Sequence, residues 1–244
     1  MIDIHCHILD GVDDGSYCLA ESVEMAKIAV ESGTRLIVAT PHANTPDGDK
    51  NVWGSMLVNK LATLNRQLKA ENVPLTVCAG QEVFSAGDVV SLLRSGAVIT
   101  LNSTRYLLIE FDFYERTDAI IDRCETLLAV GIVPVIAHPE RYEALKEDEQ
   151  TAFSLKRRGC LLQINSGSLF GAFGRTAQNV AHDFLSESLA DFVASDAHSP
   201  YVRTPYLADA HEMVSEMYSL DYADMLFRVN PGLLIRDKEI RGLY

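Results

Sequence analysis

The chain has 244 residues, of which 48% are hydrophobic and 23% charged, and its formal net charge is -13. This composition excludes an intrinsically disordered chain, and the acidic balance disfavours binding to the polyanionic backbone of nucleic acids. No apolar run reaches the ~20 residues of a membrane span. The five cysteines form no C-x-x-C pair, which predicts free thiols in the reducing cytoplasm. We also expect no signal peptide, because the first residues are typical of a strand.

Short apolar runs alternate with segments of helical periodicity along the whole chain. Strands are predicted at 1–7, 36–40, 75–79, 106–109, 132–137, 160–164 and 191–194. Helices are predicted around 19–33, 57–68, 88–94, 118–130, 142–158 and 177–188. Two more helices end the chain, and Pro205 is expected in the first turn of one of them. A polar loop is predicted at 43–50.

Seven strand–helix units without an internal repeat or a linker predict a parallel α/β fold. The length fits a single domain over residues 1–244, since α/β barrels of ~250 residues form one unit. We therefore expect a distorted barrel of seven units, with a doubly wound open sheet as the alternative.

Metal-ligating side chains follow nearly every predicted strand. In parallel barrels and open sheets, sites form at the carboxyl ends of the strands. His5 and His7 are two residues apart in a strand, so their side chains point the same way. The candidates that follow are Asp13, Asp14, His42, Glu82, Glu110, His138, Asp196 and His198. The remaining histidines, His182 and His211, fall inside predicted helices and are assigned no role.

Imidazole and carboxylate groups without a thiolate favour Mn, Fe or Zn, and the number of ligands indicates two or three ions. Such a cluster suits phosphoester hydrolysis by attack of a metal-bridging hydroxide. Arg141 and Arg203 lie close to candidate ligands in the sequence and are the candidate phosphate-binding residues, since guanidinium groups match phosphate oxygens. The sequence has no cysteine-phosphatase motif, G-x-S-x-G elbow, Walker loop or G-x-G-x-x-G motif.

Six blocks of the sequence resemble the manganese-dependent tyrosine phosphatases of capsule and exopolysaccharide operons, the CpsB/CapC family of the polymerase-and-histidinol-phosphatase (PHP) superfamily. The blocks are Ile4–Leu9, Gly11–Gly15, Ala39–His42, Tyr106–Glu110, Ala137–Tyr142 and Ser195–His198. The resemblance implies a PHP-type distorted (β/α)7 barrel that holds three Mn²⁺ ions, and it implies phosphate binding by Arg141 and Arg203. The implied ligands are His5, His7, Glu82 and Asp196 for one ion, Glu82 (bridging), Glu110 and His138 for the second, and Asp14, His42 and His198 for the third.

The implied substrate is the phosphotyrosine tail of a bacterial tyrosine kinase that controls capsule or exopolysaccharide synthesis and export. Family members often form rings through a Glu-x-x-Arg contact on the first helix. Here the corresponding residues are Glu24 and Lys27, which leaves homo-oligomerisation open because lysine cannot form a bidentate fork. Two alternatives stay open: a small-molecule phosphatase of the same superfamily, acting on a substrate like histidinol phosphate, and a non-enzymatic, metal-dependent phosphotyrosine-binding scaffold.

Overall fold

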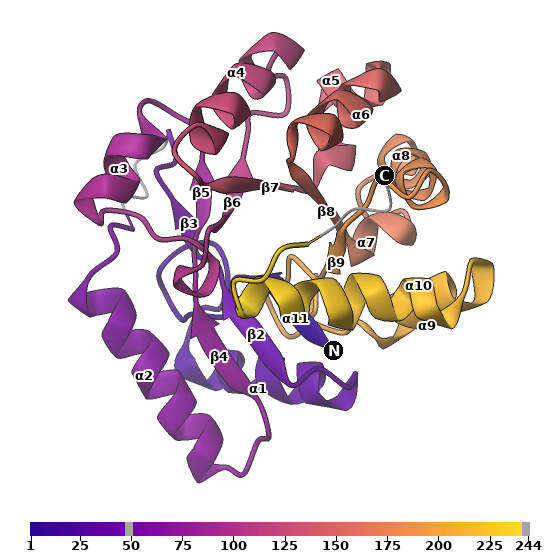
Figure 1. Ribbon diagram of the computed structural model, residues 1–244. Coiled ribbons are helices and arrows are strands. Elements are labelled where there is room, and N and C mark those ends of the chain that lie inside the picture. The colour runs from indigo at the N-terminus through magenta and orange to yellow at the C-terminus, as the bar shows by residue number, and fades with distance from the viewer. Residues whose placement is uncertain (47–50, 241–244) are drawn as a thin grey trace.

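Parallel strands surrounded by helices form the framework of the molecule (Figure 1). The computed structural model describes residues 1–46 and 51–240, so residues 47–50 of the predicted polar loop lie outside the described part. The strands are β1 (Ile2–Cys6), β2 (Leu36–Ala39), β3 (His42–Ala43), β4 (Thr76–Ala79), β5 (Glu82–Phe84), β6 (Tyr106–Glu110), β7 (Val133–Ala137), β8 (Leu161–Asn165) and β9 (Phe192–Ala194).

The nine strands make seven staves of a barrel, where a stave is either one strand or two strands that continue each other. The hydrogen-bonded orders are β1-β2-β4 and β3-β5-β6-β7-β8-β9, and every pair is parallel. Only Thr40 and Pro41 separate β2 from β3, and only Gly80 and Gln81 separate β4 from β5, so each of these pairs continues one stave. Pro41 has no N–H to donate to a neighbouring strand, which explains the first interruption. A side chain at Gly80 would place its Cβ 2.6 Å from a methyl group of Val38.

The barrel closes where β1 meets β9. The Asp196 N–H donates to the His5 carbonyl at 2.9 Å, and the His7 N–H donates to the Ala197 carbonyl at 2.8 Å. A parallel bridge between Cys6 and Ala197 lies between these two bonds. The seven-stave barrel is therefore the arrangement that the sequence predicts, and the open-sheet alternative is wrong.

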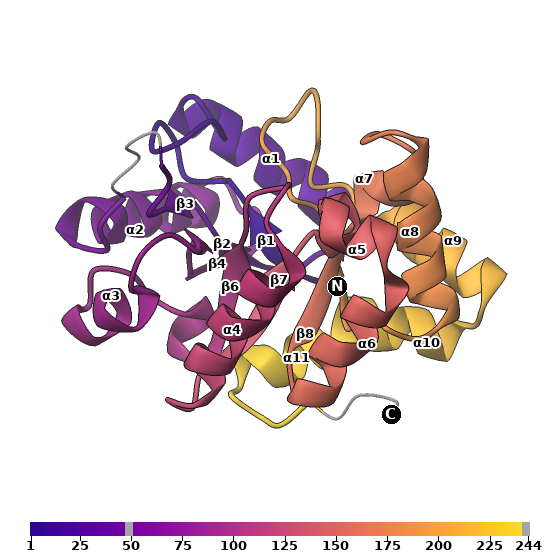
Figure 2. The ribbon, with the colours of Figure 1, turned by 90° about the horizontal axis from the view of Figure 1, so that it is seen from above.

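Helices cover the outside of the barrel (Figures 1 and 2). They are α1 (Leu19–Glu31), α2 (Ser55–Ala70), α3 (Val89–Ser95), α4 (Thr117–Leu128), α5 (Glu143–Glu147), α6 (Glu149–Arg158), α7 (Ser166–Leu169), α8 (Arg175–Ser186), α9 (Ala208–Met217), α10 (Leu220–Asp224) and α11 (Asn230–Ile235). Short segments of other helix types are η1 (Leu101–Ser103), η2 (Pro139–Arg141) and η3 (Met225–Val229), the last a π-helical turn.

The barrel interior is filled by alternating strand residues. Ile4, Val38, Leu108 and Val135 come from four staves and belong to one buried cluster. Leu234 of α11 joins the same cluster, and α11 lies across the strands in Figure 1. The interior is thus a packed core, which leaves the carboxyl ends of the strands as the place where polar side chains can meet.

Two sequence predictions about helices are wrong in detail. The helix predicted over 142–158 is interrupted at Asp148, which is extended and whose carboxylate accepts the Gln150 N–H at 3.0 Å as the N-cap of α6. Pro205 lies in the loop before α9, which begins only at Ala208, so it is not in the first turn of that helix.

Candidate metal centre

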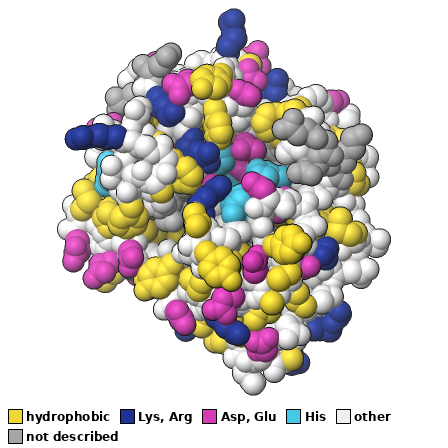
Figure 3. Space-filling view, turned by 180° about the vertical axis from the view of Figure 1, so that it is seen from behind, with side chains coloured by type: hydrophobic (Ala, Val, Ile, Leu, Met, Phe, Trp, Pro, Cys, Tyr) yellow, Lys and Arg dark blue, Asp and Glu magenta, His cyan; other side chains and the backbone are white. Residues whose placement is uncertain are grey.

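The predicted ligands come together at the carboxyl ends of the staves. Figure 3 shows histidine and acidic side chains gathered in a hollow, with Lys or Arg and hydrophobic side chains at its margin. His5 lies at the centre of one group: its Nε2 atom is 3.2 Å from His7 Nε2 and 3.3 Å from both Glu82 Oε2 and Asp196 Oδ1. His5, His7, Glu82 and Asp196 are all buried.

Glu82 connects this group to the next one. Its Oε2 atom lies 3.2 Å from His7 Nε2 and 3.1 Å from His42 Nδ1, and its Oε1 atom lies 3.0 Å from His138 Nε2. Glu110 completes this side, at 3.5 Å from His138 and 3.6 Å from His42. A carboxylate that faces four histidines from both of its oxygens is in a position to bridge two ions.

Asp14 stands at the open side of the hollow. Its side chain is 67% exposed, and its Oδ1 atom lies 3.4 Å from His198 Nε2 and 3.6 Å from His42 Nε2. The hydrogen bond from His198 lowers the pKa of Asp14. All nine side chains predicted as metal ligands are therefore in contact with at least one other member of the set.

Three sets of ligand atoms each lie within 4.8 Å of one another: His7, Asp14, His42 and His198; His5, His7 and Asp196; and His42, Glu82 and Glu110. These sets differ from the implied partition in four respects. His7 also joins the Asp14 set, and His42 also joins the Glu82 set. Glu82 is absent from the His5 set, and His138 belongs to none of the three. The assignment of each residue to one ion stays a prediction.

The unsatisfied atoms of the cluster fit a cation. His42 Nδ1 and Glu82 Oε2 are buried without a hydrogen-bond partner, although buried polar atoms normally have one. Burial and the adjacent negative charge of Glu82 raise the pKa of Glu110 to about 9. Protein groups alone thus leave the charge of Glu110 poorly compensated, and a divalent ion beside it would supply the missing positive charge.

Two residues orient the histidines from behind. Asp13 Oδ2 lies 2.7 Å from His7 Nδ1 and accepts the backbone N–H of His42 at 3.0 Å. Gln163 Oε1 lies 2.8 Å from His5 Nδ1. These contacts leave the Nε2 atoms of both histidines to face the centre, an arrangement typical of metal-bound imidazoles. Asp13 follows a candidate strand end in the sequence, whereas Gln163 gives no signal because it lies within β8.

A buried network fixes the segment that carries Arg141. The Glu140 carboxylate accepts the Asn165 N–H at 2.9 Å and the Ser168 hydroxyl at 2.6 Å. The Asn165 side chain in turn donates to Asp196 Oδ2 at 2.6 Å. Burial raises the pKa of Glu140 to about 7. The network ties η2, β8 and α7 to a candidate metal ligand.

Both predicted phosphate-binding arginines lie at the edge of the cluster. Arg203 contacts Asp196 Oδ2 at 2.5 Å, and Arg141 lies 3.7 Å from the same oxygen. The other oxygen of Asp196 faces His5 and His7. Asp196 therefore has one oxygen toward the candidate metal ligands and one toward the two cations.

The backbone is strained at three of these residues. His138, Asp196 and Arg203 have φ values of 34°, 50° and 53°, in the left-handed region that non-glycine residues seldom adopt. Each such residue costs of order 1–3 kcal/mol and persists where the surroundings fix it, often at functional sites.

The two other histidines are engaged elsewhere, as their place in helices suggested. His182 Nε2 lies 3.3 Å from the Leu169 carbonyl, and His211 Nε2 lies 2.8 Å from Asp224 Oδ1. They link neighbouring helices on the outside of the barrel, and the structure gives them no part in the centre.

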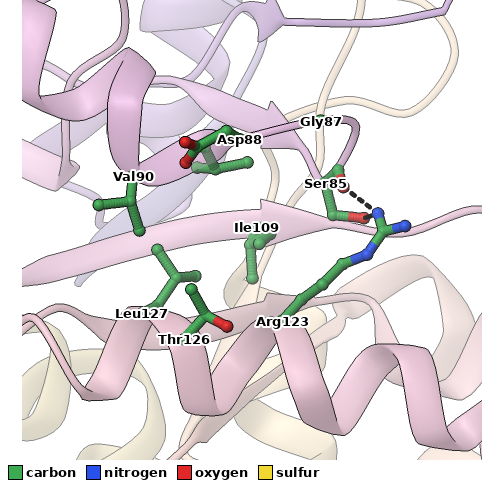
Figure 4. A pocket seen from close by; sticks show the side chains of 9 residues that line it. Ser85, Gly87, Asp88, Val90, Ile109, Arg123, Thr126 and Leu127 are labelled. Carbon is green, nitrogen blue, oxygen red and sulfur yellow. Dashed lines mark hydrogen bonds between the residues drawn. The ribbon is translucent and has the colours of Figure 1, made fainter.

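A separate cavity of about 110 Å³ lies between α3, β6 and α4 (Figure 4). The Arg123 guanidinium points across it and donates to the hydroxyl of Ser85 at 3.0 Å, and it also pairs with Glu115 at 3.5 Å. None of the predicted ligands lines this cavity. The charge of Arg123 is already compensated, so the cavity adds nothing to the metal centre.

Comparison with known proteins places the chain in a family. Residues 1–236 match the family described as capsular polysaccharide synthesis, CpsB/CapC. The chain belongs to the CpsB/CapC family. The tyrosine-protein phosphatase YwqE of Bacillus subtilis is 37% identical over 240 residues, which cover 98% of this chain and 93% of that protein.

Solved structures agree with the CpsB/CapC assignment. One comes from work on YwqE of Bacillus subtilis and CpsB of Streptococcus pneumoniae, described as unique metal-dependent tyrosine phosphatases. It matches with a TM-score of 0.90 and 36% identity, covering 99% of this chain and 97% of the other. The lactonase Lmo2620 of Listeria monocytogenes has a TM-score of 0.62 at 11% identity, over 98% and 95% of the two chains, and is similar in fold alone.

Over the described residues, no helix is both long and apolar enough to cross a membrane.

Proposed function

We propose that this protein is a metal-dependent protein-tyrosine phosphatase that acts on the phosphotyrosine tail of a bacterial tyrosine kinase controlling capsule or exopolysaccharide synthesis. One observation supports this most directly: two arginines lie against a cluster of five histidines and four carboxylates, in a family with named tyrosine-protein phosphatases. The free state of all five cysteines supports a cytoplasmic location.

We propose that the nine side chains predicted from the sequence are the metal ligands and that Mn²⁺ is the physiological ion, with three ions bound. The ligand set contains only imidazole and carboxylate groups, which suits Mn²⁺ and also admits Fe or Zn. Bound divalent ions supply a nucleophile from water at neutral pH and neutralise charge on the phosphoryl oxygens.

The roles of the protein groups follow from their positions. Arg141 and Arg203 bind the non-bridging oxygens of the phosphoryl group, displacing their contacts with Asp196 Oδ2. Asp13 and Gln163 keep the Nε2 atoms of His7 and His5 directed at the centre. The leaving group is a phenolate whose conjugate acid has a pKa near ~10, so a strong general acid is not required.

The first test uses the metal and the substrate together. The protein is stripped of metal, reloaded with Mn²⁺, and assayed for phosphate release from a phosphotyrosine peptide and from histidinol phosphate. We expect metal-dependent release with preference for the peptide. We further expect Arg141→Ala to lower kcat/KM for the peptide by about 10- to 100-fold, since it removes a charge-assisted contact to the phosphoryl group.

Each contrary result points to a defined alternative. Preference for histidinol phosphate would identify a small-molecule phosphatase. Tight binding of the peptide without phosphate release in any metal would identify a scaffold. An unchanged kcat/KM in the Arg141→Ala variant would remove Arg141 from the phosphate site.

A further inference from the structure

We propose that Phe173 is a positioning residue that holds Arg141 and Arg203 as a preformed pair, an inference that rests on the phosphate-binding role proposed for these arginines. The Cζ atom of Arg141 lies 4.5 Å from the centroid of the Phe173 ring, and that of Arg203 lies 5.3 Å from the same centroid. One aromatic ring is thus in contact with both cations.

A second ring flanks Arg141. The centroid of Phe113 lies 4.5 Å from the Arg141 Cζ atom, and this side chain is 36% exposed at the margin of the site. Phe113 also contacts the rings of His138 and Tyr142. Rings against the faces of a guanidinium leave the N–H groups in its plane free to donate, and the electron-rich ring faces stabilise the positive charge.

The position of Phe173 is not explained by the hydrophobic core. It lies in the turn between α7 and α8, is only partly buried, and belongs to none of the buried clusters. Gly171 and Gly174 on either side have φ values of 79° and 91°, which glycine adopts without strain. A Cβ on Gly167 of α7 would lie 3.2 Å from the Phe173 ring, so the ring packs closely on that helix. The turn therefore fixes the ring before any ligand binds.

The same segment restrains Arg141 by a second route. Ser168 of α7 donates to the Glu140 carboxylate, and Glu140 directly precedes Arg141. Arg203, in contrast, has a buried Nε atom without a hydrogen-bond partner. Over residues 1–46 and 51–240, Phe173 is the only aromatic ring in cation–π contact with Arg203. Losing the Phe173 ring should therefore remove one restraint from each guanidinium group, and the phosphate itself would have to order them.

The chain offers a matched control in the same turn. Phe170 and Phe173 both line a cavity of about 510 Å³ that extends from Arg203 past Tyr206. Phe170 is 51% exposed, and no cation–π contact of its ring is recorded in the described structure. The Phe170→Leu and Phe173→Leu variants make the same chemical change three residues apart. The Phe173→Trp variant keeps an aromatic face for the cations.

The test measures binding of inorganic phosphate to the Mn²⁺-loaded proteins by calorimetry, beside metal content and melting temperature. We expect Phe173→Leu to weaken phosphate binding about 5- to 30-fold, because the substitution removes two cation–π contacts. Phe170→Leu and Phe173→Trp should stay within about threefold of the wild type. In peptide hydrolysis, Phe173→Leu should raise KM more than it lowers kcat, because the arginines hold the phosphoryl group before and during the reaction.

The positioning role would be overturned if Phe173→Leu left phosphate affinity unchanged, or if Phe170→Leu lost as much phosphate affinity as Phe173→Leu. It would also be overturned if Phe173→Trp failed to keep the affinity of the wild type, or if the wild type itself did not bind phosphate. A loss of metal in Phe173→Leu would instead assign the residue to the stability of the centre and also contradict the proposal. The wild type could bind phosphate with an affinity that depends on Phe173 and still not hydrolyse the peptide. That result would contradict only the proposed function.

Discussion

At the scale of single residues, side chains outside the predicted ligand set hold its histidines in place. Asp13 accepts from His7 Nδ1 and from the backbone of His42, and its Oδ1 atom accepts the Gly15 N–H at 3.0 Å. Burial alone would lower the pKa of His7, but the charge and hydrogen bond of Asp13 help to raise it well above the ordinary value. The same negative charge makes the opposite nitrogen of the ring a better ligand.

We therefore expect Asp13→Asn to weaken Mn²⁺ binding by about 10- to 100-fold, because a neutral amide supports the imidazole less than a carboxylate does. Calorimetric titration of the metal-free protein measures this change. Asp88→Asn is the control, since Asp88 caps α3 and contacts Ser91 rather than a histidine. Equal Mn²⁺ affinity in the Asp13→Asn variant and the wild type would show that His7 needs no such partner.

The strand ends of the sequence were sufficient to find candidate ligands, because two histidines spaced i, i+2 and acids after apolar runs must meet wherever parallel strands end together. Gln163 and Phe173 could not be found in this way. The role of Gln163 depends on β8 and β1 lying on either side of β9, and that of Phe173 depends on a turn between two helices. Both are consequences of tertiary arrangement that no local pattern contains.

At the scale of elements, the contact between β1 and β9 contains a buried acid. Asp3 of β1 accepts the Ser195 hydroxyl at 2.6 Å, the Ser195 N–H at 3.1 Å and the His5 N–H at 3.3 Å. Burial raises the pKa of Asp3 from 3.8 to about 6, and these hydrogen bonds offset only part of the effect. The contribution of Asp3 to folding is thus greatest when its carboxyl group is protonated.

This shift predicts a pH dependence of stability. The folded state holds the Asp3 proton up to about pH 6, whereas the unfolded chain releases it near pH 4, so the free energy of unfolding falls as the pH rises through this window. Relative to Asp3→Asn, the wild type should lose about 2 kcal/mol between pH 4 and 6.5 and little more above it. Urea unfolding of both metal-free proteins measures the difference, and a constant difference across this range would contradict the prediction.

Local sequence patterns do not determine where some helices begin and end. Residues 142–158 have enough helical periodicity to predict one helix, yet the Asp148 carboxylate caps a new helix instead. After β8, Asn165-Ser-Gly suggests a polar turn, and the chain forms the one-turn helix α7 there. That helix carries Ser168, whose hydroxyl meets Glu140, a contact that requires η2 to lie alongside. In both places a side-chain hydrogen bond decides between local conformations of similar energy.

At the scale of the whole molecule, the proposed ligands come from six of the seven staves or the loops that follow them. They belong to, or directly follow, β1, β3, β5, β6, β7 and β9. An ion bound to them would connect staves that the backbone joins only in neighbouring pairs. Metal binding should therefore stabilise the fold as a whole rather than one loop.

We expect removal of Mn²⁺ to lower the melting temperature. At a free concentration 1,000 times its Kd, one bound ion adds about 4 kcal/mol to the free energy of unfolding. For a chain of this length that amounts to roughly 8–16 °C. Scanning calorimetry with Mn²⁺ and with a chelator measures the shift. Ca²⁺, which prefers oxygen ligands, serves as the control and should have a smaller effect. Identical melting temperatures with Mn²⁺ and chelator would exclude a metal centre that joins the staves.

The sequence leaves homo-oligomerisation through Glu24 and Lys27 of α1 open. Lys27 of α1 pairs with Glu71 of the same chain at 2.9 Å, and both side chains are partly exposed. Because a surface ion pair contributes little to stability, an intermolecular contact of Lys27 can replace this pair.

If Asp196 is a metal ligand and the two arginines bind phosphate, as proposed, the two oxygens of Asp196 link the metal centre and the anion site thermodynamically. An ion coordinated by Oδ1 would leave less negative charge at Oδ2, which contacts Arg141 and Arg203. The guanidinium groups would then be freer to bind phosphate. Linkage is reciprocal, so whatever factor the metal adds to phosphate affinity, phosphate adds to metal affinity. The protein should consequently saturate with Mn²⁺ at a lower free concentration in the presence of phosphate than in its absence.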